Sequence, residues 1–206
     1  MRVFLTGGSS GIGQTINKDL QKDHDVVALP RSELDLSKPF LAWLSDFDAL
    51  VLCAGADRSG DQPFVDMPDD DWQYNIQVNL IANMHLVKFY LDQRPPNWGK
   101  IIVIGSTVTD YAWPGKISYS VSKTGLETFC QGIQRELPPE IGLTYIQPGL
   151  CKTNLRYNRH KGTVSHSEID AWYAGQNYMV PEDLVAPVRT ALNDQQHLLK
   201  HIRLEK

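Results

Sequence analysis

The sequence predicts an α/β fold, with a doubly wound, mostly parallel sheet of six or seven strands and helices on both faces. Short apolar runs alternate along the chain with longer segments of helical period, which is the pattern of repeated strand–helix–strand units. The runs are almost continuously apolar, as expected for strands covered on both faces. No internal repeat, low-complexity tract or linker divides the 206 residues. We therefore expect one domain over residues 1–206.

Six strands and four helices account for this alternation. The expected strands are Arg2–Thr6, Asp25–Leu29, Asp48–Ala54, Lys100–Ser106, Gly142–Gln147 and a last short one near Ile202–Leu204. The first helix carries the apolar stripe Ile12, Ile16 and Leu20, and the last covers Glu182–Leu192 with Pro181 in its first turn. The two long helices cover Asp69–Leu91, with the stripe Trp72, Ile76, Leu80, Met84 and Val87, and Ile117–Leu137, with the stripe Leu126, Phe129, Cys130, Ile133 and Leu137. Pro138-Pro139 stops the second, because proline cannot continue a helix.

Composition and charge exclude several classes of partner. Hydrophobic residues make up 42% of the chain and charged residues 21%, which is ordinary for a globular protein. A net charge of −4 gives no basic footprint for nucleic acid or an anionic membrane. The three widely spaced cysteines and six histidines form no disulfide framework or metal motif. We therefore expect that the protein binds no metal. Because the start of the sequence has no signal-peptide profile, we also expect a cytoplasmic protein.

A glycine-rich loop joins the first strand to the first helix. Thr6-Gly7-Gly8-Ser9-Ser10-Gly11-Ile12-Gly13 allows a tight turn and lets backbone N–H groups approach a pyrophosphate at the positive end of the helix dipole. Glycines also form ordinary turns, but the strand–loop–helix context favours dinucleotide binding in a Rossmann-like fold. The loop lacks the Gly-Lys-Ser/Thr ending of a P-loop NTPase.

The TGxxxGxG spacing of this loop resembles the short-chain dehydrogenase/reductase family, in a compact single-domain form. Further motifs follow in the family's order: Cys53-Ala54-Gly55 in place of Asn-Asn-Ala-Gly, Asn79 in a helix, Ser106 at a strand end, Tyr119 and Lys123 as YxxxK, and Pro148-Gly149 with Thr153 after a strand. The resemblance implies a nicotinamide-dependent oxidoreductase that interconverts a ketone or aldehyde and an alcohol. Cys53 departs from the family motif, and thiols form weak hydrogen bonds, so that loop must be held in another way.

Tyr119 and Lys123 are the candidates for the proton transfer. They stand at i and i+4 of the expected helix and therefore project from the same face. A nearby ammonium favours the phenolate, so we expect Lys123 to lower the pKa of Tyr119 from its ordinary value near 10. The resemblance implies that Tyr119 is the general acid/base and that Ser106 orients the substrate. It also implies that Lys123 tunes the tyrosine and holds the nicotinamide ribose, and that Asn79 supports a water relay.

Each of these residues also has a purely structural interpretation. Tyr119 and Lys123 could be a surface pair on a helix, since unsupported YxxxK recurs by chance. Ser106 could cap the turn that begins at Thr107, and Asn79 could be a buried helix residue satisfied by backbone. Their joint occurrence with the glycine loop favours catalysis.

Residues after the second strand decide between the two nicotinamide dinucleotides. An acidic residue there binds the ribose 2′-hydroxyl of NAD, whereas arginine accommodates the 2′-phosphate of NADP. Arg31 and Ser32 stand at this point, so we expect NADP, with NAD as the alternative if Arg31 is only an exposed turn residue. Asp35-Leu36 resembles the family's pair beside the adenine. The short stretch from Arg31 to Asp35 lacks the helix and strand usual in the family, so one crossover is trimmed.

Residues 150–180 are expected to form a substrate-binding loop or lid. Arg156, Arg159, His160 and Lys161 form either a solvated surface, which most charge runs are, or a site for an anionic substrate. Trp172, Tyr173 and Tyr178 either wall an apolar pocket or pack the lid onto the domain.

Three functional hypotheses follow. The leading one is an NADP-dependent carbonyl reductase or alcohol dehydrogenase acting on a small molecule. The second is a non-catalytic dinucleotide-sensing or scaffolding protein, although a sensor needs no general acid. The third is an epimerase or dehydratase, which the compact carboxyl-terminal half disfavours. The two long helices resemble those that form family dimers, so we expect a homodimer or homotetramer.

Overall fold

The computed structural model describes residues 1–42, 44–93, 98–111, 113–160, 162–194 and 200–205. It confirms the doubly wound sheet: the described residues form six strands in the order β2-β1-β3-β4-β5-β6, and every neighbouring pair is parallel. The strands are β1 (Arg2–Thr6), β2 (Asp25–Val27), β3 (Ala49–Leu52), β4 (Gly99–Ile104), β5 (Ile141–Pro148) and β6 (Lys200–Leu204).

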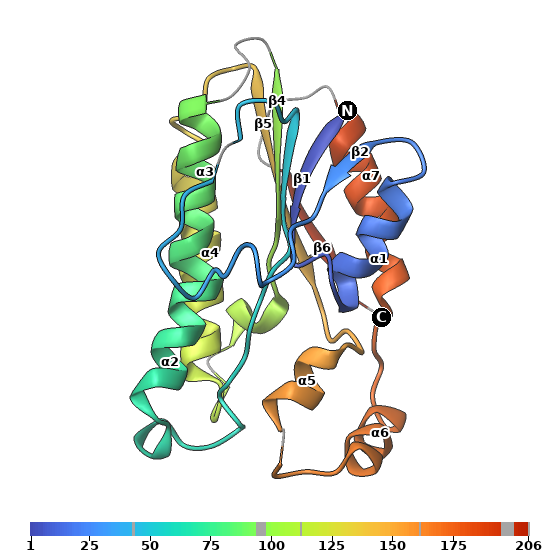
Figure 1. Cartoon of the computed structure of the whole chain (residues 1–206). Helices are drawn as coiled ribbons and strands as arrows, with labels where there is room; N and C mark the ends of the chain where they lie inside the picture. Colours follow the sequence, from blue (N-terminus) through green and yellow to red (C-terminus); the bar gives the residue numbers. More distant parts are fainter. Residues whose placement is uncertain (43, 94–97, 112, 161, 195–199, 206) are drawn as a thin grey trace.

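Helices cover both faces of the sheet, which gives the molecule three layers (Figure 1). On one face lie α2 (Asp69–Ile76), the π turn η2 (Gln77–Ile81), α3 (Ala82–Gln93) and α4 (Ile117–Ile133); on the other lie α1 (Gly11–Leu20), η4 (Pro181–Leu184) and α7 (Val185–Asn193). Since successive strand residues point to opposite faces, the core has two halves. Phe4 packs towards α3 and α4, whereas Val3 and Leu5 pack towards α1 and α7. No helix of the described ranges is long and apolar enough to cross a bilayer.

The crossover after β2 is trimmed, as the sequence predicts. Between Val27 and Ala49 the described residues form turns but no helix or strand. The turn at Pro30 accepts two backbone hydrogen bonds, from the amides of Glu33 and Leu34, both at 3.0 Å. β2 is therefore the edge of the sheet, and this short segment covers the end of the cavity described below.

The predicted apolar stripe of the first long helix is confirmed at Val87, which is buried, and at Leu80, which packs against the core, and it is wrong at the other three positions. Met84 is exposed, and Trp72, Ile76 and Leu80 are only partly buried. Besides apolar residues such as Val78, Ala82 and Leu86, the helix buries three asparagines at four-residue spacing, Asn75, Asn79 and Asn83. Their amides find partners that an apolar side chain could not replace: Asn75 donates to Ser118 Oγ at 2.9 Å and Asn79 to Ser122 Oγ at 3.0 Å. A polar stripe thus joins this helix to α4.

The segment 150–180 lies across the carboxyl ends of the strands (Figure 1). It contains two short helices, α5 (Asn154–Arg159) and α6 (His166–Ala174). Thr153 caps the first, its Oγ accepting from the Leu155 amide at 3.3 Å, and Ser165 forms a capping box with Glu168 at the start of the second. A backbone bridge between Cys151 and Met179 closes the base of the segment, so its helices stand over the sheet as one unit.

Candidate active site

A cavity of about 840 Å³ opens at the carboxyl ends of the strands. β1 lies between β2 and β3, so the chain adds β2 on one side of β1 and then crosses over to add β3 on the other side. Open α/β sheets bind ligands at such a switch point. The cavity runs from the turn after β2, past the glycine loop, to α5 and α6.

The glycine loop has the geometry of an anion cradle. Gly7 and Gly11 have φ of 75° and 52°, which side chains rarely tolerate. A Cβ on Gly13 would stand 2.2 Å from the Gly7 carbonyl oxygen, so the helix can approach the loop only because this residue is glycine. The Ser10 side chain makes no cap hydrogen bond, and the first turn of α1 holds no acidic residue. The N–H groups of that turn are therefore available to a phosphate, and the loop fits a dinucleotide.

The loop at Cys53 is held by hydrogen bonds between its backbone and neighbouring side chains rather than by its thiol. Thr6 Oγ1 accepts from the amides of Cys53 and Ala54, both at 3.1 Å. Asn79 Oδ1 accepts from the Ala56 amide at 2.8 Å, and Asn79 Nδ2 donates to the Ala56 carbonyl at 2.8 Å. Burial raises the pKa of the Cys53 thiol to about 12, so it stays neutral. Replacing the family's asparagine with Cys53 thus leaves the loop braced from both sides.

Asn79 lies behind the cavity rather than in it. The Asn79 side chain is fully buried in the π turn. The side-chain amide of Asn83 donates to the main-chain carbonyl oxygen of Asn79 at 2.8 Å. The structural interpretation of Asn79 is therefore correct as far as its side chain goes: it positions Ala56 and Ser122. The water relay implied by the family remains a prediction.

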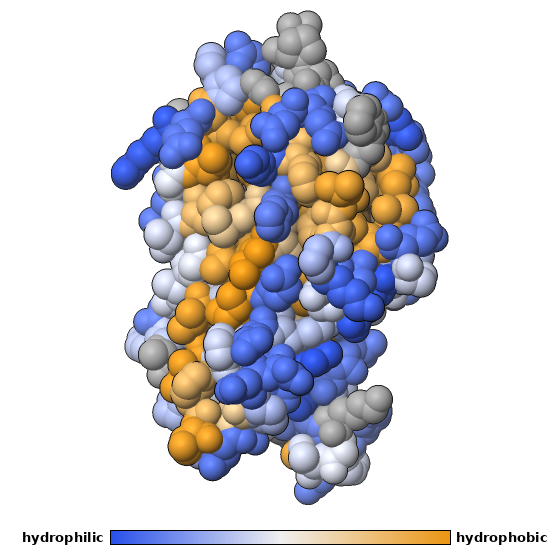
Figure 2. All heavy atoms as spheres, turned by 60° about the vertical axis from the view of Figure 1, so that its left-hand side comes forward, coloured by the Kyte–Doolittle hydropathy of each residue, from blue (hydrophilic) through white to orange (hydrophobic). Residues whose placement is uncertain are grey.

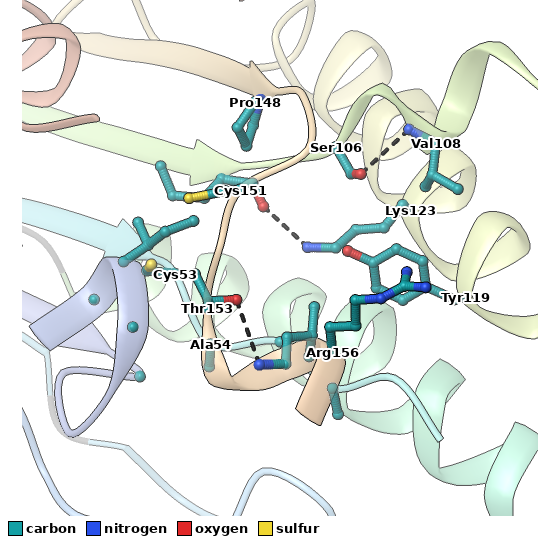
Figure 3. A pocket seen from close by; sticks show the side chains of 18 of the residues that line it. Cys53, Ala54, Ser106, Val108, Tyr119, Lys123, Pro148, Cys151, Thr153 and Arg156 are labelled. Atoms are coloured by element: carbon teal, nitrogen blue, oxygen red, sulfur yellow. Dashed lines mark hydrogen bonds between the residues drawn. The ribbon is translucent and has the colours of Figure 1, made fainter. Parts of the chain in front are cut away.

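Ser106, Tyr119 and Lys123 meet at the end of β4 (Figure 3). Ser106 Oγ accepts from the Val108 amide at 3.2 Å, so it does cap the turn η3 (Thr107–Asp110), and it lines the cavity together with Tyr119. Lys123 Nζ donates to the Ile104 carbonyl at 3.0 Å. Tyr119 and Lys123 are 8% and 4% exposed, which rules out the surface-pair interpretation.

The expected effect of Lys123 on Tyr119 is wrong for the protein alone. Burial, followed by the nearby Asp57 carboxylate, raises the pKa of Tyr119 to about 12, although Ser106 and Arg159 act in the opposite direction. Burial also lowers the pKa of Lys123 to about 8. The loss of hydration is the largest effect on the pKa of both groups, which lie in the interior, and Lys123 is turned towards the Ile104 carbonyl. Tyr119 is consequently held as a neutral proton donor.

The nucleotide end of the cavity is formed by the turn after β2. Arg31 is 63% exposed, and its Nε lies 3.4 Å from Asp35 Oδ1. Asp35 also accepts from Ser37 Oγ at 2.7 Å, and these contacts lower its pKa. Ser32 is exposed and is not among the residues that line the cavity, so its contact with the cofactor stays a prediction.

The other predicted cofactor residues do line the cavity. They are Gly7, Ser9, Ser10, Gly11, Ile12, Gly13, Arg31, Asp35, Leu36, Cys53, Ala54, Gly55, Tyr119, Lys123, Pro148, Gly149 and Thr153.

Several lining residues escaped the sequence analysis, among them Tyr74, Lys116 and Arg203. No motif marks Lys116 or Arg203. The Ser-x-x-Glu capping signature of Ser165 and Glu168 was readable, however, and would have placed α6 in the loop segment.

The charged run in this segment is not a solvated surface. The side chains of Arg156 and Arg159 are 14% and 7% exposed, and His160 is buried. The interpretation as a solvated loop is therefore wrong for these residues, while Lys161 lies outside the described ones.

The aromatic residues of this segment both line the cavity and pack against one another. Trp172 and Tyr173 line the cavity, and the Tyr178 ring packs on Tyr173 with centroids 5.3 Å apart.

Comparisons with known proteins agree with this geometry. The family model described as short chain dehydrogenase matches residues 35–163, more than half of the chain. A 3-oxoacyl-(acyl-carrier-protein) reductase of Buchnera aphidicola is 28% identical over 180 residues, covering 74% of this chain and 74% of the relative. Serine 3-dehydrogenase of Rhizobium radiobacter is 25% identical over 202 residues, covering 96% of this chain and 80% of the relative. The structure of a serine dehydrogenase complexed with NADP+ shares the fold, with a TM-score of 0.79 at 21% identity over 100% of this chain and 95% of that one.

Proposed function

The chain belongs to the short-chain dehydrogenase family and is a nicotinamide-dependent oxidoreductase acting on carbonyl and alcohol groups, and we propose that Tyr119 transfers the proton in its reaction. One observation carries this proposal. Ser106, Tyr119 and Lys123 converge on the cavity that the glycine loop opens into, and Tyr119 is buried there as a neutral phenol. A sensor would need the glycine loop but not this group of side chains.

In the proposed reduction, the nicotinamide supplies the hydride when bound. Negative charge then develops on the substrate oxygen, and the Tyr119 hydroxyl donates its proton to that oxygen. The Ser106 hydroxyl, which lines the same cavity as Tyr119, holds the substrate oxygen beside the phenol. Lys123 and the glycine loop position the dinucleotide, and α5 and α6 cover the reacting groups from water.

The experiment that tests the function measures cofactor oxidation by the purified chain. We expect NADPH to bind and to be consumed with at least one ketone or aldehyde of a broad panel, and NADP+ to be reduced with the matching alcohol. Tight binding of NADPH without turnover on any carbonyl or alcohol would instead identify a dinucleotide sensor.

NADPH is the proposed preferred cofactor, with NADH as a weaker alternative. Arg31 lines the nucleotide end of the cavity, and its ion pair with Asp35 is a weak one because the Arg31 side chain is mostly exposed. A guanidinium suits a phosphate, whereas Asp35 is already engaged by Ser37 and Arg31. The relative complexed with NADP+ is consistent with this preference.

Arg31→Ala should weaken NADPH binding about tenfold, as expected for one charge-assisted contact at an exposed site. NADH binding should change less than about twofold, because NADH has no 2′-phosphate. Fluorescence titration of both cofactors measures the two constants. Arg58→Ala is the matched control: the guanidinium carbons of Arg31 and Arg58 lie 5.6 Å and 3.4 Å from the centroid of the Tyr74 ring, but Arg58 does not line the cavity. Equal losses for NADPH and NADH would contradict the phosphate role.

We further propose a homodimer or homotetramer in the cytoplasm. Apolar side chains gather on the face of α2, α3 and α4 (Figure 2), where Ile81, Met84, Ile117 and Val121 are exposed. Such a surface supports association between copies, and light scattering distinguishes the two states from a monomer. None of the three cysteines, all of which the structure describes, is in a disulfide, which is consistent with a reducing compartment.

A further inference from the structure

The substrate end of the cavity contains a buried cluster of charges. Arg156 and Arg159 stand one turn apart on α5, and both line the cavity that holds Tyr119. In Figure 3 the Arg156 side chain extends from α5 into this cavity, on the side of Tyr119. A cation in such a place is costly unless something compensates its charge. The partners of each arginine therefore show what the cluster can still bind.

Arg159 is committed to the protein. It forms ion pairs with Asp57, whose side chain is fully buried, and with Asp61, at 3.3 Å from Nη1 to Oδ1. These contacts fasten α5 to the loop that precedes α2. Removing the Arg159 guanidinium would leave the Asp57 carboxylate buried without its cation, so this residue is structural.

Arg156 is not committed in this way. Its closest described carboxylate oxygen, Asp61 Oδ2, is 4.0 Å from Nη2 and lies closer to His160, at 3.2 Å. Its Nε is buried without a hydrogen-bond partner. The guanidinium carbon lies 3.5 Å from the centroid of the Trp172 ring, which holds the group flat against α6. The guanidinium is planar and presents parallel N–H donors, and the aromatic ring fixes its orientation. This geometry matches the two oxygens of a carboxylate.

The charge balance favours an anion with a single charge. Among the described residues of this corner, Lys116, Arg156 and Arg159 contribute three positive charges, and Asp57 and Asp61 two negative ones. Burial lowers the pKa of His160 from its ordinary value, so it adds no charge at neutral pH. One positive charge is left over. A carboxylate neutralises it, whereas a phosphate dianion would leave an excess of negative charge.

We propose that Arg156 binds the carboxylate of the substrate, and that the enzyme therefore acts on small oxo acids and hydroxy acids rather than on neutral carbonyl compounds. This inference rests on the proposed oxidoreductase function. In reduction, the carbonyl carbon gains the hydride of NADPH and the oxygen gains the Tyr119 proton, while the carboxylate takes no part in bond changes. Arg156 thus selects the substrate and orients its carbonyl group.

The test compares acids with their methyl esters. Pyruvate, acetoacetate and laevulinate are each assayed beside the methyl ester with wild type, Arg156→Gln, Arg156→Lys and the control Lys152→Gln. Lys152 is in the same segment and pairs with Asp170 at 2.9 Å, but it does not line the cavity. We expect at least one acid to exceed its ester in kcat/KM. Arg156→Gln should lower that value for the acid about 100-fold, mainly through KM, because one partner of a buried charge pair is lost.

Other outcomes separate the possible failures. Kcat/KM for the ester and the Kd for NADPH should stay within about threefold in Arg156→Gln, and Arg156→Lys should recover part of the activity on the acid. An equal fall for acid and ester would show a structural role and overturn the proposal. Turnover of neutral carbonyls with no preference for an acid would overturn it as well, while leaving the proposed function intact. Absence of turnover on every compound would defeat both.

Discussion

Tyr119→Phe is expected to lower kcat for carbonyl reduction by about 1000-fold while leaving the Kd for NADPH nearly unchanged. The substitution removes the only proton donor that the proposed mechanism places at the substrate oxygen. The ring is 8% exposed, and its packing is kept in phenylalanine, so the cofactor site should retain its shape. Stopped-flow and steady-state assays with NADPH measure kcat, and fluorescence titration measures the Kd.

Tyr157→Phe serves as the control for this substitution. It also removes a phenolic oxygen from the carboxyl-terminal part, where Tyr157 donates to Asp170 at 2.6 Å, but it lies outside the cavity lining. Its kcat should match that of the wild type. Retention of more than about a tenth of the wild-type kcat in Tyr119→Phe would exclude Tyr119 as the general acid.

The ionisation of Tyr119 provides an independent readout. Since burial raises its pKa to about 12, the protein without cofactor should show no phenolate from this residue below about pH 10. The difference in phenolate absorbance between the wild type and Tyr119→Phe should therefore stay near zero up to that pH. A difference that grows through neutral pH would instead mean that the Lys123 ammonium governs Tyr119, as the helix spacing alone suggests.

The features that could be predicted from sequence are local ones. The glycine loop, the YxxxK spacing and the nearly continuous apolar strands each lie within a few residues, and the structure brings all of them to one end of the sheet. The family resemblance extended this reading to Ser106, which no local pattern singles out. The trimmed crossover also followed from counting residues between Arg31 and Asp35.

The features that could not be predicted depend on tertiary contacts. Asn75 and Asn79 occupy the buried side of their helix because α4 offers serine partners, which a count of apolar residues does not reveal. The pKa of Tyr119 depends first on its burial, which the helix spacing of Tyr119 and Lys123 does not reveal. The charges of α5 resemble a solvated run until Asp57, more than 90 residues earlier in the chain, is seen to pair with Arg159.

Gly13→Ala is the second substitution with a large expected effect. The added methyl group would lie 2.2 Å from the Gly7 oxygen and 2.7 Å from the Gly7 carbonyl carbon, and neither backbone atom can move without opening the loop. We expect NADPH binding to weaken at least about 100-fold, because the loop amides would no longer be aligned with the pyrophosphate. The free energy of unfolding should fall by about 1–3 kcal/mol, as for other overpacked sites. Titration with NADPH and urea denaturation measure the two quantities.

Gly132→Ala isolates the steric cause of that effect. Gly132 is also a helical glycine, in α4, but nothing lies within 4 Å of the position its Cβ would take. There the same substitution should raise the free energy of unfolding by about 0.5–1 kcal/mol, since alanine favours the helix, and NADPH binding should not change. The two variants should thus move stability in opposite directions. If Gly13→Ala bound NADPH as tightly as Gly132→Ala does, the close approach of α1 to the glycine loop would not be what shapes the dinucleotide site.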